Sequence, residues 1–246
     1  MSRTPASRLP FDAGGGLVVL VDPGRTSPDD AYRLAERAAD GGASGFLVGD
    51  SLGRGGDVTA TVAAIRGGAP GLSVVQFPAS AAELSADVDA ILFLTLLSGR
   101  NPRYLVEEQV RASAFFDRHP DVFALSTAYL LIDGGRVSSV QRVTGTEPLS
   151  PDRPDVVAAH VKAGRLMGMR ATYLEAGSGA PRPVAESVIA AARDASDAPL
   201  FVGGGITTPA AARAARRAGA DYVVVGTLFE REPALGVGAL ATAARA

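Results

Sequence analysis

The stretch from Pro199 to Thr227 constrains the fold of this chain more than any other part of the sequence. Two short apolar runs, Leu200–Val202 and Tyr222–Val225, are typical of buried strands. Between them lies a helical segment in which Thr208 is a good N-cap and Pro209 suits the first helical position. A strand, a helix and a second strand in this order predict two adjacent parallel strands, whose carboxyl ends meet at one edge of a sheet.

Glycines follow both strands and form a candidate phosphate site. Gly203, Gly204 and Gly205 follow the first strand, and Gly226 and Thr227 follow the second. Backbone N–H groups that no Cβ shields can close on a phosphate. In (β/α)₈ barrels the loops after strands seven and eight do this. Two tight turns without a ligand are the alternative, but the pair of turns at this spacing favours phosphate.

The rest of the chain repeats the same strand-then-helix alternation, about eight times in all, as in a TIM barrel. No low-complexity linker divides the 246 residues, of which 47% are hydrophobic. We therefore predict one α/β domain over residues 1–246, a (β/α)₈ TIM barrel in which residues 1–12 form an irregular leader. A doubly wound sheet is the alternative fold, but the glycine fingerprint G-x-G-x-x-G is missing after the first strand.

Three segments depart from a regular barrel. Only about a dozen residues separate Pro78 from the predicted strand Ala90–Leu94, which is barely enough for a crossover helix, so the third helix should be short or irregular. A turn at 133–135 followed by the alternating stretch Val137–Val143 predicts a β-hairpin. A closing helix is expected from about Pro233 to the end of the chain.

Composition excludes several classes of function. With a net charge of −2, the chain lacks the excess of positive charge that is typical of nucleic-acid-binding proteins. The chain has no cysteine, which excludes disulfides and thiolate chemistry and fits a cytoplasmic protein. With two histidines, a zinc site is not expected. The single lysine, Lys162, lies in a helical pattern, so a Schiff-base mechanism has no good candidate.

No segment of the sequence resembles a targeting or membrane-spanning segment. The first apolar run, Leu17–Val21, is too short for the apolar core of a signal peptide. A hydrophobic substrate would therefore have to be met at the membrane surface or in a groove of the protein.

Glu175 is the best candidate for a general base. It follows the predicted strand Ala171–Leu174, where the active sites of barrels form, and stands beside glycines close to the inferred phosphate site. The two-residue period of a strand places Tyr173 on the same face. The alternative is a glutamate that caps a neighbouring loop.

Asp22 and Ser51 are candidate ligands of Mg²⁺. Asp22 ends the first strand, and Ser51 follows the second. One carboxylate and one hydroxyl are too few to hold a metal ion by themselves. They are sufficient for Mg²⁺, which commonly takes one or two carboxylates and completes its ligands with water and substrate phosphates. A loop-capping role for Asp22 is equally consistent with the sequence.

Tyr104 is the one aromatic residue of its helix that could face the barrel mouth. It lies in the first turn of a helix opened by Asn101 and Pro102, whereas Phe115 and Phe116 further along form a stripe typical of a core. From the residues alone, the chain is predicted to be a barrel enzyme that acts on a small phosphate ester, with Mg²⁺ and a second anion as candidate partners.

Five motifs occur in order along the chain. They are Ser98–Pro102 (S-G-R-N-P), Ser126–Gly135 (S-T-A-Y-L-L-I-D-G-G), Tyr173–Gly179 (Y-L-E-A-G-S-G), Val202–Ile206 (V-G-G-G-I) and Val225–Thr227 (V-G-T). These motifs resemble those of the geranylgeranylglyceryl phosphate synthase family, and the resemblance covers nearly the whole chain, from about Leu17 to Phe229. The longest motif points to the branch with archaeal and bacterial members.

The resemblance implies an Mg²⁺-dependent prenyltransferase of ether lipid synthesis. It would join geranylgeranyl diphosphate to the 3-hydroxyl of sn-glycerol 1-phosphate, with Glu175 taking the proton, and its third helix would be replaced. Asp22 and Ser51 would hold Mg²⁺, and an aromatic at Tyr104 would limit the prenyl groove. We also expect a homo-oligomer and transient contact with the membrane surface. Glycerol 1-phosphate would be held by Tyr173, Leu174, Glu175, Ala176, Gly177, Ser178, Gly179, Gly204, Gly205, Gly226 and Thr227.

The sequence departs from the family at one motif. The family usually continues D-P-D-K after the first strand, whereas Asp22 and Pro23 are followed here by Gly24 and Arg25. The second carboxylate is lost, and a planar guanidinium, which is not equivalent to an ammonium, replaces the lysine.

Three other functions remain open at this stage. The chain could use a longer prenyl diphosphate such as heptaprenyl diphosphate. It could be a sugar-phosphate isomerase or lyase barrel with the same phosphate turns, although such enzymes usually need a second acid/base group or a lysine at a strand end. It could be a catalytically silent barrel subunit, against which Glu175 and Asp22 argue.

Overall fold

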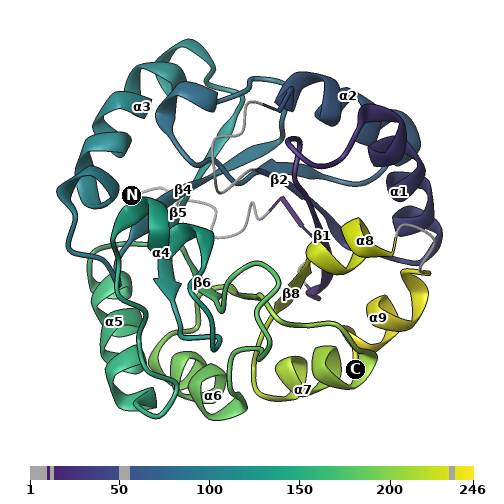
Figure 1. Cartoon of the computed structure of the whole chain (residues 1–246). Helices are drawn as coiled ribbons and strands as arrows, with labels where there is room; N and C mark the ends of the chain where they lie inside the picture. The colour runs from purple at the N-terminus through teal and green to yellow at the C-terminus, as the bar shows by residue number, and fades with distance from the viewer. Residues whose placement is uncertain (1–9, 12–13, 50–55, 233–235) are drawn as a thin grey trace, which may run out of the picture.

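The computed structural model describes residues 10–11, 14–49, 56–232 and 236–246. Eight parallel strands pair in sequence order and close into a barrel, with the helices as an outer ring (Figure 1). The predicted TIM barrel is confirmed. Its strands are β1 (Gly16–Val21), β2 (Gly45–Val48), β3 (Val74–Gln76), β4 (Ala90–Leu96), β5 (Phe123–Leu131), β6 (Ala171–Glu175), β7 (Leu200–Gly203) and β8 (Tyr222–Val225).

The helices begin where the sequence supplies caps. Ser27 Oγ accepts a hydrogen bond from Asp30 N at 3.2 Å, and Thr208 Oγ1 accepts one from Ala211 N at 3.2 Å, as expected of N-caps. The helices are α1 (Pro28–Asp40), α2 (Val58–Gly68), the π-helical turn η2 (Arg103–Glu107) continuing into α3 (Glu108–Arg118), α4 (Ser139–Thr144), α5 (Pro154–Leu166), α6 (Glu186–Ala195), α7 (Pro209–Arg217), α8 (Thr227–Arg231) and α9 (Gly238–Ala243).

The third crossover is irregular, as the sequence predicts. A single 3₁₀ turn, η1 (Ala81–Glu83), stands between β3 and β4 where other crossovers carry a full helix. The buried Gln76 side chain fixes this segment, because its Nε2 donates to Glu83 O at 2.6 Å and its Oε1 accepts from Ser85 N at 2.9 Å. The outer ring of helices is therefore incomplete beside β3 and β4.

The predicted β-hairpin at Val137–Val143 is wrong. Most of this stretch forms helix α4, which Ser138 caps by accepting a hydrogen bond from Gln141 N at 3.0 Å. Gly145 ends the helix in the left-handed conformation, with φ of 67°. Valines three residues apart fit one face of a helix as well as a ragged strand, and the serine cap decides between the two.

The end of the chain also differs from the expected single helix. The short helix α8 follows β8 directly, and α9 begins only at Gly238; Pro233 lies outside the described residues. The glycine turn after β8 therefore leads at once into helix, which places Thr227 in a first helical turn.

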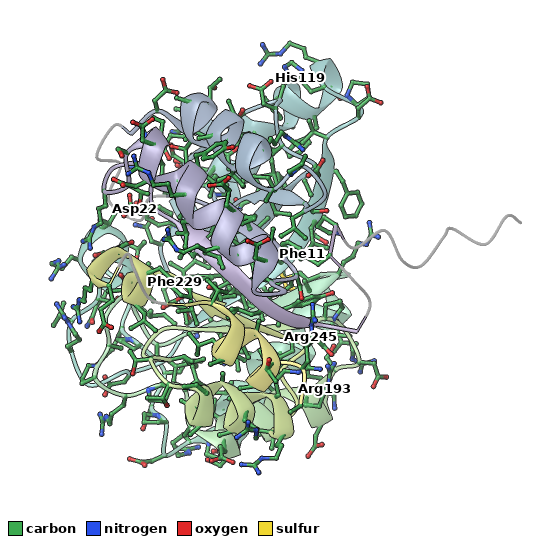
Figure 2. All side chains as sticks on the ribbon, turned by 90° about the vertical axis from the view of Figure 1, so that its right-hand side faces the viewer. Phe11, Asp22, His119, Arg193, Phe229 and Arg245 are labelled. Carbon is green, nitrogen blue, oxygen red and sulfur yellow. The ribbon has the colours of Figure 1, made fainter. Side chains whose placement is uncertain are left out.

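Aromatic side chains fill the barrel interior. The rings of Phe201 and Tyr222 stack at 4.6 Å between centroids, and Tyr173 stacks on Phe77 at 5.1 Å. Phe11 packs on Tyr222 at 5.4 Å, lying beside the amino ends of the strands, whereas Asp22 follows the carboxyl end of β1 on the opposite side (Figure 2). A ligand must therefore sit above this filled core, at the carboxyl ends of the strands.

None of the helices in the described part of the chain combines the length and the hydropathy needed to cross a bilayer.

Candidate active site

A polar cavity of about 340 Å³ opens at the carboxyl ends of the strands. The turns after β6, β7 and β8 form most of its wall, and the start of α4 completes it. The structure thus brings together many residues expected to bind glycerol phosphate: Tyr173, Glu175, Ser178, Gly179, Gly204, Gly205, Gly226 and Thr227.

The expected binding residues Leu174, Ala176 and Gly177 do not line this cavity. The side chains of Leu174 and Ala176 are buried in the layer between the strands and the helices, on the opposite face of β6 from Glu175. Gly177 contributes its backbone, since its N–H donates to Glu175. Their contribution is therefore to shape the turn after β6 rather than to contact a ligand through side chains.

Glu175 is a buried carboxylate with a perturbed acidity. Its side chain is 7% exposed, and Oε1 accepts a hydrogen bond from Gly177 N at 2.6 Å. Burial raises the pKa of Glu175 to about 7, an increase that the Gly177 N–H and the nearby Tyr173 hydroxyl partly offset. A carboxylate with this pKa can both accept and release a proton near neutral pH, as a general base must.

The Tyr173 hydroxyl lies beside this carboxylate. A Cβ placed on Gly203 would lie 2.5 Å from the Tyr173 hydroxyl and 3.1 Å from Glu175 Oε2, so the two groups converge on one point. The hydroxyl is buried and makes no hydrogen bond of good geometry to any described residue. Burial and then the charge of Glu175 raise the pKa of Tyr173 well above its usual range, so the phenol stays neutral. A neutral hydroxyl therefore stands next to the carboxylate of Glu175.

Glycine is required where the turn after β7 meets the turn after β6. Gly204 has φ of +85°, and a Cβ on it would lie 2.6 Å from Glu175 Oε1 and 2.7 Å from Gly177 N. Because Gly204 has no side chain, the turn after β7 packs directly against the Glu175 carboxylate and the backbone of Gly177.

A hydrogen bond joins the turns after β6 and β8. Ser178 Oγ lies 2.8 Å from Thr227 Oγ1, so these hydroxyls connect residues 49 positions apart in sequence. Ser178, Thr227, Gly204 and Gly205 all line the polar cavity, where hydroxyls and bare backbone N–H groups are suited to bind a phosphate.

The sequence reasoning missed several residues of the same cavity. Ser138 and Ser139 lie in the stretch predicted as a hairpin, and Thr207 directly precedes the predicted N-cap Thr208. Arg231 also lines the cavity, from the last position of α8. A capping pattern at Ser138 was the only sequence signal that could have revealed the helix at the cavity wall.

Asp22 is engaged in an ion-pair network outside this cavity. Its Oδ1 accepts from Gly24 N at 2.8 Å, and Oδ2 lies 3.4 Å from Arg25 Nε. Arg25 Nη1 also pairs with Glu230 Oε2 of α8 at 3.2 Å. Arg25 thus links the loop after β1 to α8; Ser51 lies outside the described residues.

Asp22 fits the substrate-assisted mode of Mg²⁺ binding. Among the described residues no group of three or more histidine, aspartate or glutamate side chains could hold a metal ion unaided. Asp22 is 16% exposed at the side chain, so one hard carboxylate remains accessible beside a cationic loop. This donor suits Mg²⁺ that takes its other ligands from water and substrate phosphates.

A second, apolar cavity of about 130 Å³ lies beside the polar one, over the irregular third crossover. Tyr104 lines it, together with residues of η1 and β4. The two cavities share wall residues: Leu20, Phe77, Tyr129 and Val140. Tyr104, the aromatic residue of its helix that could face the barrel mouth, therefore lines this apolar cavity, here called the apolar channel, which adjoins the polar one.

A closed barrel with a glycine-lined cavity and a buried carboxylate at the carboxyl ends of its strands is the arrangement of a (β/α)₈-barrel enzyme. The model of the PcrB family matches residues 15–243. The chain belongs to this family.

Similar proteins carry the name that the sequence motifs indicate. The chain is 40% identical to a geranylgeranylglyceryl phosphate synthase of Spirosoma linguale over 219 residues, covering 89% of this chain and 87% of that protein. It is 40% identical to the protein of the same name from Aeropyrum pernix over 243 residues, covering 95% and 90%. The resemblance to this family is therefore confirmed.

Solved structures agree with the barrel. The (S)-3-O-geranylgeranylglyceryl phosphate synthase of Thermoplasma acidophilum, in complex with sn-glycerol 1-phosphate, matches with a TM-score of 0.85 and 33% identity over 95% of this chain and 92% of that chain. An N-acetylmannosamine-6-phosphate 2-epimerase of Clostridium perfringens matches at 13% identity with a TM-score of 0.59, covering 95% of each chain. The second likeness is one of fold alone.

Proposed function

We propose that this chain is a geranylgeranylglyceryl phosphate synthase. It transfers the geranylgeranyl group from its diphosphate to the 3-hydroxyl of sn-glycerol 1-phosphate in ether lipid synthesis. The observation that carries the proposal is the meeting of a polar, glycine-lined cavity and an apolar cavity along a shared wall, with Glu175 facing the polar side. That arrangement matches one small phosphate ester and one long apolar chain.

Glycerol 1-phosphate would bind with its phosphate on the glycine turns. Backbone N–H groups around Gly204, Gly205 and Gly226 and the hydroxyls of Ser178 and Thr227 surround that position. The glycerol would then extend toward the carboxylate of Glu175 on the neighbouring strand.

In the transfer, the 3-oxygen of glycerol forms a bond to C1 of the prenyl group as the C1–oxygen bond to diphosphate breaks. The hydroxyl proton passes to Glu175, whose pKa of about 7 leaves much of it ionised at neutral pH. The neutral Tyr173 hydroxyl beside it would orient the attacking oxygen. Alignment of the two substrates is the main task left to the protein, because an allylic carbon tolerates positive charge.

Asp22 and Ser51 would hold Mg²⁺ at the carboxyl ends of β1 and β2. When bound, Mg²⁺ neutralises charge that develops on the departing diphosphate. Arg25 stands 3.4 Å from Asp22 and would add a guanidinium to the same anion.

The prenyl chain would leave the diphosphate along the apolar cavity. Tyr104 lies on the wall of that cavity and would limit the length of chain that fits. In this proposal the enzyme acts in the cytoplasm as a homo-oligomer and takes its prenyl substrate at the membrane surface, since such a chain is poorly soluble in water.

A product assay tests the proposal. Purified protein with Mg²⁺ receives sn-glycerol 1-phosphate and either geranylgeranyl or heptaprenyl diphosphate, with sn-glycerol 3-phosphate as the mismatched acceptor. We expect an ether product from the twenty-carbon donor and the 1-phosphate. A marked preference for the thirty-five-carbon donor would instead assign the longer-chain activity. Absence of any ether product with either donor would overturn the prenyltransferase.

A further inference from the structure

We propose that Arg231 is a phosphate-binding residue of the glycerol phosphate site, where it supplies the positive charge that the glycine turns lack. This inference rests on the proposed function, because it assumes that the anionic group held there is the phosphate of a glycerol ester.

The cavity needs a cation. Among the described residues that line it, Glu175 and Glu232 carry carboxylates, and Arg231 carries the only positive side chain. A phosphate dianion brought close to an ionised Glu175 would be repelled, and backbone N–H groups offer only partial charges to offset that repulsion. Arg231 is the one lining residue able to supply a full positive charge.

Arg231 lies next to the turn after β6, at the edge of the proposed phosphate site. It stands four residues after Thr227 in α8, so the two side chains share a face of the helix. A Cβ built on Gly179 would lie 3.2 Å from Arg231 Nη2 and 3.6 Å from Thr227 Cγ2. The guanidinium therefore reaches the Ser178–Gly179 turn, beside the hydroxyl pair that joins this turn to α8.

No described residue forms an ion pair with Arg231, unlike several other arginines of the chain. Arg25, for comparison, is held between Asp22 and Glu230, and Arg193 is paired with Asp221 at 2.8 Å. A guanidinium that pairs with no carboxylate of the described residues, next to a polar cavity, can form a two-pronged contact with phosphate oxygens.

A second arginine approaches the same glycine from another segment. Arg136 Nη1 donates to Gly179 O at 3.3 Å and lies 3.7 Å from the Cβ position described above. Arg136 comes from the loop before α4, whereas Arg231 ends α8. Arg136 thereby fixes the carbonyl of the turn and adds positive charge to its rim, while Arg231 remains available to the ligand.

The test compares binding and turnover in Arg231→Met with a matched control, Arg217→Met. Arg217 is an exposed arginine of α7 that does not line the cavity. Titration calorimetry with sn-glycerol 1-phosphate should give a Kd about 10- to 100-fold higher for Arg231→Met, the range expected when a charge-assisted hydrogen bond is lost. Arg231→Lys should fall between that variant and the wild type, and Arg217→Met should match the wild type.

Kinetics on the same proteins separate this role from a structural one. The KM for glycerol 1-phosphate should rise in Arg231→Met in step with Kd, while the KM for geranylgeranyl diphosphate and the thermal unfolding midpoint stay close to the wild type. The inhibition constant of inorganic phosphate should also be higher in this variant, because inorganic phosphate would lose the same contact. Unchanged affinity for glycerol 1-phosphate, or a shift confined to the prenyl diphosphate, would overturn the assignment of Arg231. A wild-type protein that binds glycerol 1-phosphate but forms no ether product would overturn the proposed function and leave the role of Arg231 standing.

Discussion

Among single residues, Glu175 combines burial, a polar partner and proximity to the glycine turns. Its carboxylate would act as the general base in the proposed reaction. Glu175→Gln keeps the shape of the side chain but removes the basic oxygen, so kcat should fall by about two to four orders of magnitude. Steady-state assays and calorimetry would measure turnover and the affinity for glycerol 1-phosphate, which should remain nearly intact.

Glu36→Gln is a suitable control for this variant, because Glu36 is exposed in the middle of α1. It should leave kcat unchanged. Turnover within a few fold of the wild type in Glu175→Gln would show that another group takes the proton.

The raised pKa of Glu175 sets a pH dependence of the activity. Burial raises its pKa to about 7, and only the ionised form can accept the proton of the attacking hydroxyl. Activity should therefore increase with pH up to and through about 7 and level off above it. A profile of kcat/KM against pH checks this, and a profile that is flat between pH values of about 5.5 and 8 contradicts the role of Glu175.

Asp22 supports a separate prediction about Mg²⁺. Asp22→Asn removes the charge of the one accessible carboxylate in the loop after β1, so the Mg²⁺ concentration needed for half-maximal activity should rise about tenfold or more. The affinity for glycerol 1-phosphate should change little. Glu230→Gln serves as the control, because it removes the other partner of Arg25 without touching Asp22. Overlapping Mg²⁺ titrations for Asp22→Asn and the wild type would place the metal elsewhere.

At the scale of secondary-structure elements, the irregular third crossover creates the apolar channel. A full helix between β3 and β4 would cover the space that η1 leaves open above these strands. The π-helical turn η2 then places Tyr104 on the channel wall, with the guanidinium of Arg103 5.4 Å from its ring centroid. The short turn η1 thus leaves space for the apolar channel, and η2 places an aromatic side chain in its wall.

Tyr104→Ala should lengthen this channel. Each additional buried CH₂ of a prenyl chain is worth about 0.8 kcal/mol, so removal of the ring should raise kcat/KM for the thirty-five-carbon donor relative to the twenty-carbon donor. Parallel assays with the two donors measure the ratio. Phe115→Ala, at a partly buried residue of α3 that does not line the apolar cavity, provides a control for general loosening. An unchanged ratio with lower thermal stability would show that Tyr104 serves packing alone.

At the scale of the whole molecule, burial of the ionised Glu175 carboxylate lowers the free energy of unfolding. In the unfolded chain Glu175 has its ordinary pKa of 4.5, whereas in the folded protein the pKa is about 7. Between these values the folded state holds a proton that the unfolded state has lost, so stability falls as pH rises through this window. The full penalty above pH 7 is about 3 kcal/mol.

Glu175→Gln should remove this penalty. The variant should be more stable than the wild type by up to about 3 kcal/mol at pH 8, with the difference reduced to below about 1 kcal/mol at pH 5. Denaturant unfolding at the two pH values measures it, and Glu36→Gln should show no such pH-dependent difference. Equal stability of Glu175→Gln and the wild type at pH 8 would mean that the carboxylate is better solvated than its burial indicates.

The sequence alone determined the barrel and the edge at which its site lies. Apolar runs that alternate with amphipathic segments indicate parallel strands joined by helices. Parallel strands have their carboxyl ends on one side, which brings Glu175, Gly204 and Thr227 to the same end of the barrel regardless of loop conformation. The short stretch after Pro78 is likewise barely long enough for a full crossover helix, and the structure has a single 3₁₀ turn there. These features follow from local pattern and chain length.

Only the tertiary structure decided how side chains from distant segments meet. Leu174 and Ala176 face the helix layer while Glu175 faces the cavity, and helix α4 rather than a hairpin closes the wall. Arg231 reaches Gly179 because α8 starts directly after β8. The burial that raises the pKa of Glu175 comes from neighbouring strands and turns far away in sequence. Solvent exclusion and charge proximity depend on distances through space, which a linear pattern of residues does not contain.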